Sequence, residues 1–155
     1  MEYLAIKWLH ILSSTVLFGT GMGSAFYMFA ASRTREPRLV AVVVRHVVMA
    51  DWLFTTPAIV LQPLTGFYLM HLAGFPFAAG WIRWSIVLYL VAGAAWLPVV
   101  WMQIRMRDFA TAAAAAGRPL PDIYWRYLNR WIALGVVAFV SLVVVFYLMV
   151  AKPSL

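Results

Sequence analysis

The stretch Trp131–Met149, WIALGVVAFVSLVVVFYLM, contains no charged residue and decides the class of fold. About 20 apolar residues in a helix, rising about 1.5 Å each, cross the roughly 30 Å hydrocarbon core of a bilayer. Three further stretches meet that length, at Tyr3–Ala31, Ala50–Leu72 and Trp84–Met102. The sequence therefore predicts an all-α fold, in which a single domain over residues 1–155 forms a bundle of four transmembrane helices.

The composition agrees with a membrane protein. Hydrophobic residues make up 65% of the chain and charged residues only 11%, which is too few to cover a water-soluble domain. The net charge of +7 is compatible with nucleic-acid binding, but the basic residues lie in the connections between apolar stretches, where they set topology. We therefore expect a lipid bilayer around the protein and no nucleic-acid partner. The absence of cysteine excludes disulfides and thiolate-bound metals.

Basic residues gather in two of the connections. Arg33, Arg35 and Arg38 follow the first apolar stretch, whereas the second connection holds only Arg83. Because cytoplasmic connections are enriched in Lys and Arg, we expect the first and third connections in the cytoplasm and both termini on the outer, periplasmic side. The third connection holds Arg105, Arg107, Arg118, Arg126 and Arg130.

Prolines and glycines mark the expected ends and bends of the helices. Pro37 is expected to precede the second helix, and Gly117 to end the third. Pro57 and Pro63 lie inside the second helix and should kink it, because proline lacks an N–H and crowds the preceding turn. The first apolar stretch has no basic segment before it and is too long for the core of a signal peptide, so we expect it to remain in the mature protein.

A histidine inside the first apolar stretch is the leading candidate for a functional residue. A polar side chain at membrane depth is costly unless it faces protein, water or a ligand. His10 shares one helical stripe with Ser13, Ser14, Gly21 and Ser24, so this face is expected to pack inward. His10 is then either a neutral imidazole hydrogen-bonded across the bundle or an axial ligand of haem iron.

The same helix contains three glycines, which leave its surface without side-chain bulk at Gly19, Gly21 and Gly23. The spacing of Gly19 and Gly23 is typical of two helices in close contact, and we favour that explanation for the glycines. The alternative is the close approach of a flat ligand such as a porphyrin.

Lys7 and His71 extend the hypothesis of a haem site. Lys7 lies one turn before His10, from where its ammonium reaches either a haem propionate or the lipid headgroups. His71 ends the second apolar stretch on the outer side and is either a second haem ligand or an interfacial histidine in water. Met70 is the substitute if His71 does not bind, and His46 is expected too near the cytoplasmic side to share an iron with His10.

Asp51 is the only acid near the interior of a predicted span. Its partners are expected on other helices, and the candidates are Gln103, Arg105, Asn129 and Arg130. We favour one structural ion pair that locks the bundle, and the alternative is a polar cluster on the cytoplasmic side.

Part of the sequence resembles a known family. Ile6-Lys7-Trp8-Leu9-His10-Ile11 with Phe18-Gly19, the run Met49–Gly66, and the ending Val150-Ala151-Lys152-Pro153 resemble the bacterial membrane-bound protoporphyrinogen oxidase family. That family binds haem b through a histidine at the His10 position, and more loosely the resemblance extends to Lys7. The chain departs from the family at two places, with Met28–Ser32 in place of a Tyr-His pair and Ala50-Asp51-Trp52 after Met49, where the family has acidic and basic residues. The resemblance therefore supports the bundle and the haem more than it supports porphyrin oxidation.

Across its whole length the chain resembles an uncharacterised bacterial family of four-helix integral membrane proteins, a domain of unknown function. We therefore expect a multi-pass protein of the bacterial inner membrane that binds haem b, with His10, His71, Lys7, Ser14 and Gly21 around the cofactor. The expected function is electron transfer or redox chemistry on a quinone or porphyrin, as an oxidoreductase if it is an enzyme. The alternative is a non-enzymatic membrane subunit or scaffold without cofactor, in a homo-oligomer or a larger membrane complex.

Overall fold

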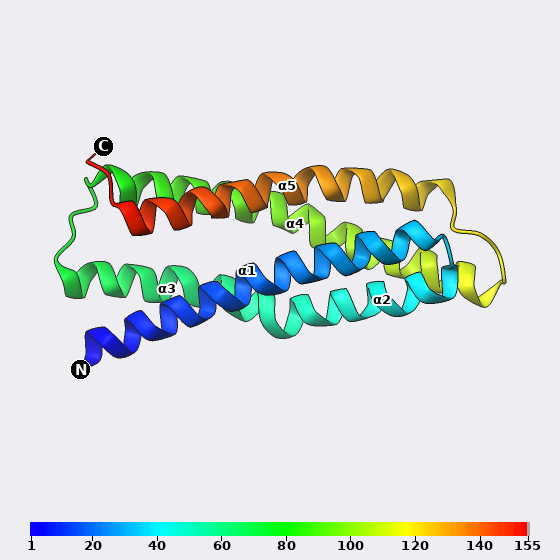
Figure 1. Ribbon diagram of the computed structural model, residues 1–155, viewed down its shortest axis with the longest axis horizontal. Coiled ribbons are helices and arrows are strands. Elements are labelled where there is room, and N and C mark those ends of the chain that lie inside the picture. The colour runs from blue at the N-terminus through cyan, green and yellow to red at the C-terminus, as the bar shows by residue number, and fades with distance from the viewer. Residues whose placement is uncertain (155) are drawn as a thin grey trace.

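A computed structural model describes residues 1–154 as long helices that lie side by side along one axis (Figure 1). A π-helical turn, η1, joins α2 to α3 without a break, so these elements form one continuous rod. Both chain termini lie at the same end of the molecule (Figure 1). The elements are α1 (Glu2–Thr34), α2 (Pro37–Ala50), η1 (Asp51–Thr55), α3 (Thr56–Ala73), α4 (Gly80–Ala115) and α5 (Asp122–Ala151).

Within residues 1–154, three helical segments are long and apolar enough to cross a membrane: Pro37–Ala73, Gly80–Ala115 and Asp122–Ala151. The predicted all-helical, multi-pass character is thereby confirmed. α1 has 33 residues, about 50 Å of helix, but it carries more polar residues than the other three segments. Its role as a fourth span stays a prediction.

The helix ends follow from single residues. Pro37 opens α2, and the carboxylate of Glu36 before it accepts the backbone N–H of Arg38. α4 ends at Ala115, just before Gly117 takes a left-handed backbone with φ of 61°. α5 ends at Ala151, where Lys152 has a positive φ and Pro153 prevents another turn. The predicted starts and stops at Pro37 and Gly117 are confirmed.

The kink predicted at Pro57 takes the form of the π-helical turn. Proline has no N–H to donate, and its ring crowds the carbonyl four residues earlier. The helix widens instead, so that Thr56 donates both its backbone N–H and its hydroxyl to the carbonyl oxygen of Asp51. The widened turn leaves Asp51 only 4% exposed and Thr55 only 3% exposed, both facing the inside of the bundle.

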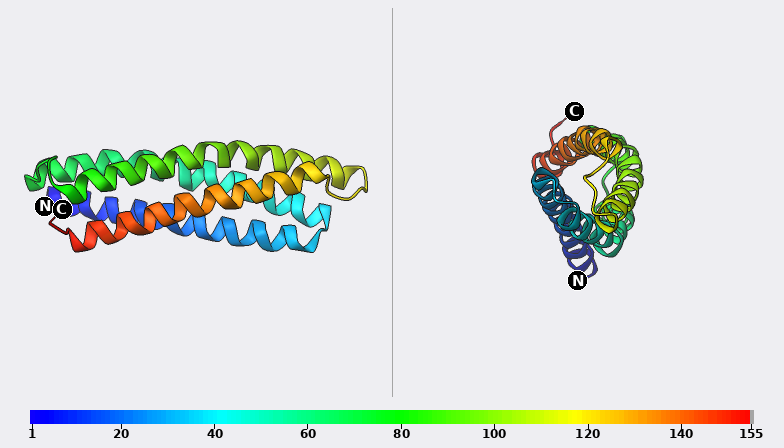
Figure 2. Two further views of the ribbon diagram at one scale, coloured as in Figure 1. Left: turned by 90° about the horizontal axis from the view of Figure 1, so that it is seen from above. Right: turned by 90° about the vertical axis from the view of Figure 1, so that its right-hand side faces the viewer.

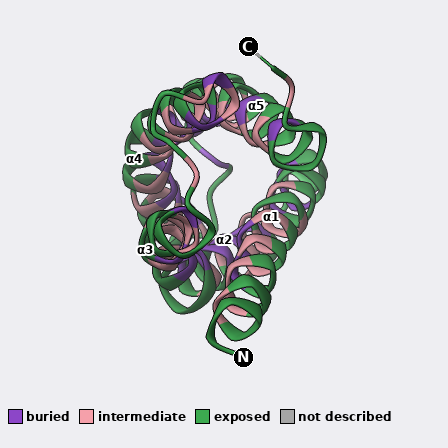
Figure 3. Ribbon diagram, turned by 90° about the vertical axis from the view of Figure 1, so that its left-hand side faces the viewer, coloured by how far each residue is buried: buried purple, intermediate pink, exposed green. Residues whose placement is uncertain are grey.

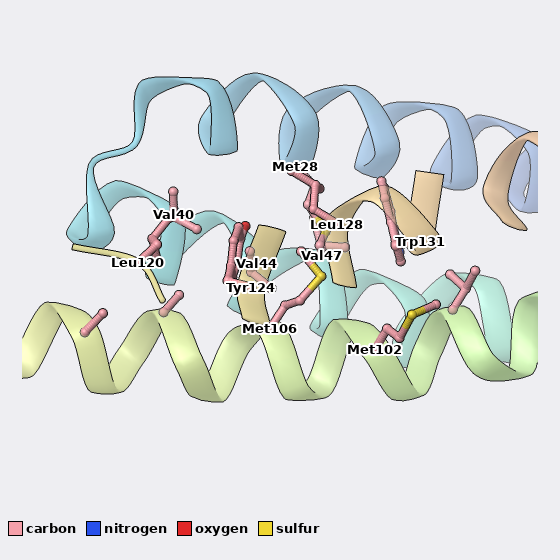
Figure 4. Packing of buried hydrophobic residues seen from close by; sticks show 13 residues of the cluster. Met28, Val40, Val44, Val47, Met102, Met106, Leu120, Tyr124, Leu128 and Trp131 are labelled. Carbon is pink, nitrogen blue, oxygen red and sulfur yellow. The ribbon is translucent and has the colours of Figure 1, made fainter. Parts of the chain in front are cut away.

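The densest packing lies in the half of the molecule that holds the α1–α2 and α4–α5 connections. There Met28, Val44, Met106 and Tyr124 from four different helices are fully buried together (Figure 4). Seen end-on, the buried residues face the middle of the ring of helices and the exposed ones face outward (Figure 3). Many of the outward side chains are large and apolar, as a lipid-facing surface requires.

The rods form a ring when viewed along their length (Figure 2). α1 packs mainly on α2 and α3, and α4 packs mainly on α5 and α2, whereas α1 and α5 touch at few places. Phe18 of α1 makes one of these contacts, because its ring stacks on Phe139 at 5.0 Å and meets Phe146 edge-on at 5.4 Å. The α1–α5 boundary is therefore a loose seam of the ring.

Candidate functional site

His10 is half-buried on α1 and turns its ring toward α3. Its Nδ1 lies 2.7 Å from the hydroxyl oxygen of Thr65, and that hydroxyl donates its own proton to the carbonyl of Leu61 at 2.6 Å. Since threonine has only one hydroxyl proton, Nδ1 of His10 must be the donor in the contact between them. A neutral imidazole with its proton on Nδ1 carries a free lone pair on Nε2.

Three residues of α3 contact His10. The side-chain amide of Gln62 donates to the carbonyl of His10 at 2.7 Å and also to the hydroxyl of Ser13. At Gly66 a Cβ would stand only 3.3 Å from Cε1 of His10, so the glycine leaves room for the ring. Gln62, Thr65 and Gly66 therefore form one face of α3 that holds the histidine.

Sequence reasoning missed Gln62 and Thr65. The signal was present, because an amide and a hydroxyl spaced one turn apart in an apolar stretch share a helical face.

The structure places the other predicted site residues at some distance from the ring of His10. His71 is exposed and follows Thr65 by nearly two turns, roughly 9 Å along α3. Ser14 donates its hydroxyl to the carbonyl of Ile11. Gly21 lies about 16 Å from His10 along the axis of α1. Lys7 is exposed one turn before His10, with its ammonium 5.8 Å from the ring of Tyr3. The ligand roles of these residues stay predictions.

His46 is exposed near the far end of the rod, where its Nδ1 bonds to the carbonyl of Val42 at 2.7 Å. It lies about 28 Å from Thr65 along the continuous helix. The expected separation of His46 from His10 is confirmed. No group of three His, Asp or Glu side chains that suits a metal ion occurs in residues 1–154.

A second polar group surrounds Asp51. Thr55 donates its hydroxyl to the Asp51 carboxylate at 2.8 Å, and Gln103 of α4 lies beside the same carboxyl group. The structural ion pair predicted for Asp51 is wrong, because the only ion pair in the described part of the chain joins Arg107 to Asp108. The arginines face outward because α4 turns Gln103 inward and α5 turns apolar positions inward. Gln103 is the one predicted neighbour that the structure confirms, whereas Arg105, Asn129 and Arg130 are exposed.

Two buried polar atoms near Asp51 have no hydrogen-bond partner among residues 1–154. They are the side-chain oxygen Oε1 of Gln103 and the indole nitrogen Nε1 of Trp131. Gln103 is 2% exposed and Trp131 is 5% exposed, so water outside the bundle does not reach them. An unpaired acceptor and an unpaired donor thus lie in the same region, which native interiors rarely tolerate.

A cavity of about 360 Å³ lies between α1 and α5 and is closed behind by η1 and α4. Asp51, Gln103 and Trp131 line it together with apolar and aromatic side chains. Gly21 of α1 and Gly135 of α5 also line it, and a Cβ built on either would find no atom within 4 Å.

The close helix contact predicted at Gly19 and Gly23 is wrong within this chain. Neither residue has an atom within 4 Å of a Cβ placed on it, and Gly21 between them is equally open. Of these three glycines, only Gly21 lines the cavity.

These features define a multi-pass integral membrane protein with polar groups enclosed among its helices. No curated protein and no solved structure matches the chain. A family model described as predicted integral membrane protein, domain of unknown function 2269, matches residues 4–153, and the chain belongs to that family.

Proposed function

We propose that this protein binds one haem b through Nε2 of His10 and serves electron transfer or redox chemistry on a hydrophobic partner, a quinone or a porphyrin. The observation that carries the proposal is the hydrogen bond from Nδ1 of His10 to Thr65. Histidines that bind metals commonly donate their other ring N–H to an oxygen atom, which fixes the ring and directs the free lone pair to the metal.

The donor set suits haem better than a bare metal ion. Porphyrin supplies four ligands to its iron, so one or two protein side chains complete the site. His10 is one such side chain, and Lys7, one turn nearer the end of α1, offers a cation for a propionate. Bound haem iron supplies a one-electron carrier, and the protein's part is to hold the imidazole in a single orientation through Thr65 and Gln62.

The proposed topology places this site near the outer surface. We take α1 as a fourth membrane span and place both termini on the periplasmic side of a bacterial inner membrane. Support comes from the arginines of the first and third connections and from the position of both termini at one end of the molecule (Figure 1). His10 then lies about two turns inside the outer face, where an electron carrier is reachable from lipid-soluble partners.

One observation also favours a scaffold without cofactor. The bonds of His10 to Thr65 and of Gln62 to the carbonyl of His10 tie α1 to α3, as purely structural polar contacts do. A structural histidine accounts for the held Nδ1 and leaves the free Nε2 without a role. The two functions therefore differ in what Nε2 binds.

Absorption spectroscopy of the purified full chain decides between them. The protein is expressed with added haem precursor, extracted in mild detergent, and scanned for a Soret band. We expect a band in the wild type, none in His10→Ala, and an unchanged band in the control His46→Ala, which alters an exposed histidine. A colourless wild type, or a band that survives His10→Ala, contradicts the proposal. His71→Ala tests the second ligand, because its loss should convert a low-spin spectrum to a high-spin one.

A further inference from the structure

We propose that the cavity between α1 and α5 binds the ring of a quinol, the reduced form of a quinone, with Gln103 and Trp131 as its hydrogen-bond partners. The ligand is one of the two hydrophobic partners named above, so its choice rests on the proposed redox function. The site itself is separate, because His10 does not line the cavity.

The unpaired atoms define the hydrogen bonds that a ligand must supply. Oε1 of Gln103 can only accept, and Nε1 of Trp131 can only donate. A ligand that satisfies both must therefore donate at one position and accept at a neighbouring one. A quinol meets this requirement through one phenolic hydroxyl that donates and a second hydroxyl or a methoxy oxygen that accepts, whereas an oxidised quinone can only accept a hydrogen bond. Asp51 stands beside Gln103 as a further partner for a hydroxyl.

The size and walls of the cavity select a single flat ring. A volume of about 360 Å³ lies at the low end of the range for ligand pockets, which suits one substituted ring and excludes a tetrapyrrole. Phe18, Trp96 and Phe139 supply aromatic faces for stacking. Gly21 of α1 and Gly135 of α5 line the cavity, and a Cβ at either position meets no atom within 4 Å, so neither residue takes up space that a ring needs.

The charges around the cavity exclude an acidic headgroup. Asp51 is the only ionisable side chain in the lining, and no lysine or arginine lines the cavity. A fatty acid or a phosphate would meet a carboxyl group and no cation among the buried side chains that line the cavity. A neutral headgroup is therefore required, and quinones are neutral in both the oxidised and the two-proton reduced form.

Access is from the lipid. α1 and α5 touch at few places, and Phe18 with Phe139 stands at the boundary between them. The side chains on this side of the cavity are apolar, so a prenyl tail can leave between the two helices while the ring stays at Gln103 and Trp131.

The test measures binding of decylubiquinone and decylubiquinol to the detergent-purified full chain by equilibrium dialysis. Gly135→Leu fills the cavity without meeting another atom at its Cβ, and we expect at least about tenfold weaker binding. Gln103→Met and Trp131→Phe each remove one hydrogen bond and should weaken binding about fivefold. The matched control Gly19→Leu adds the same side chain to α1 outside the cavity and should bind like the wild type.

Folding of each variant is checked by circular dichroism and size-exclusion chromatography. His10→Ala should bind the quinol normally, which separates this site from the haem. Binding that survives Gly135→Leu, equal binding of dodecanol or palmitate, or no binding to the wild type would overturn the proposal and leave the cavity to water.

Discussion

Tyr124 of α5 donates its phenolic hydroxyl to Ser32 of α1 across 2.7 Å, and both side chains are fully buried. The donor is assigned because the hydroxyl of Ser32 gives its own proton to the carbonyl of Met28, also at 2.7 Å. This chain of two hydrogen bonds is the polar link between α1 and α5 at the end where the core is densest (Figure 4). These bonds join α1 to α5 at one end of the boundary between the two helices, and the cavity lies between the same helices nearer the middle of the molecule.

Because Tyr124 donates to Ser32 and Ser32 donates to Met28, removing the hydroxyl of Ser32 should cost more stability than removing that of Tyr124. Tyr124→Phe removes one hydrogen bond and leaves Ser32 bonded to Met28, so we expect a loss of about 1 kcal/mol in unfolding free energy. Ser32→Ala leaves the Tyr124 hydroxyl buried without a partner and should cost about 2 kcal/mol. Denaturant unfolding in detergent micelles measures both. Equal losses, or a larger loss for Tyr124→Phe, would mean that Ser32 is the donor to Tyr124.

Gly66 offers a second prediction. A methyl group there would stand 3.3 Å from Cε1 of His10 and push the ring away from Thr65, so Gly66→Ala should lower the amount of haem bound per protein. Gly93→Ala is the matched control, because a Cβ at Gly93 in α4 meets nothing within 4 Å. The control gains helix propensity and should be about 0.5 kcal/mol more stable with haem content unchanged. Normal haem in Gly66→Ala would show that the ring does not need its present position.

The features that the sequence predicts well depend on one residue or on local composition. The start at Pro37 and the stop at Gly117 follow from backbone chemistry at single positions, and the membrane class follows from apolar length. The partner of His10 lies far away in the chain, and it is set by how α1 crosses α3. No periodicity within α1 contains that information.

Asp51 shows the same limit. Gln103 and Arg105 are close in sequence and were both reasonable partners, but only the rotation of α4 about its axis decides which one faces inward. The cavity exists because the side chains of α5 do not fill the space between α5 and α1. The open glycines of α1 were visible in the sequence, yet only the arrangement in space shows that no helix covers them.

The absence of an ion pair at Asp51 leads to a third prediction. Asn at this position keeps an oxygen that accepts the Thr55 hydroxyl and carries no charge in a buried place. Asp51→Asn should therefore be at least as stable as the wild type in thermal unfolding at neutral pH. Asp51→Ala is the contrasting variant, because it removes the acceptor and should lower stability by about 1 kcal/mol. A loss of several kcal/mol in Asp51→Asn would reveal a cation paired with the carboxylate.

The topology can be tested directly because the chain contains no cysteine. Single cysteines are introduced at Ser154, next to the C-terminus, and at Ala116, between α4 and α5, where both native side chains are exposed. A membrane-impermeant maleimide is added to intact spheroplasts and, separately, to permeabilised ones. We expect Ser154→Cys to react in both and Ala116→Cys only after permeabilisation, because connections rich in arginine, as the α4–α5 region is, favour the cytoplasmic side. A third variant, Met1→Cys behind a short leader tag that supplies the start codon, reports the N-terminus. If it reacts only after permeabilisation while Ser154→Cys reacts in intact spheroplasts, α1 does not cross the membrane, and His10 cannot lie at the depth that the haem proposal requires.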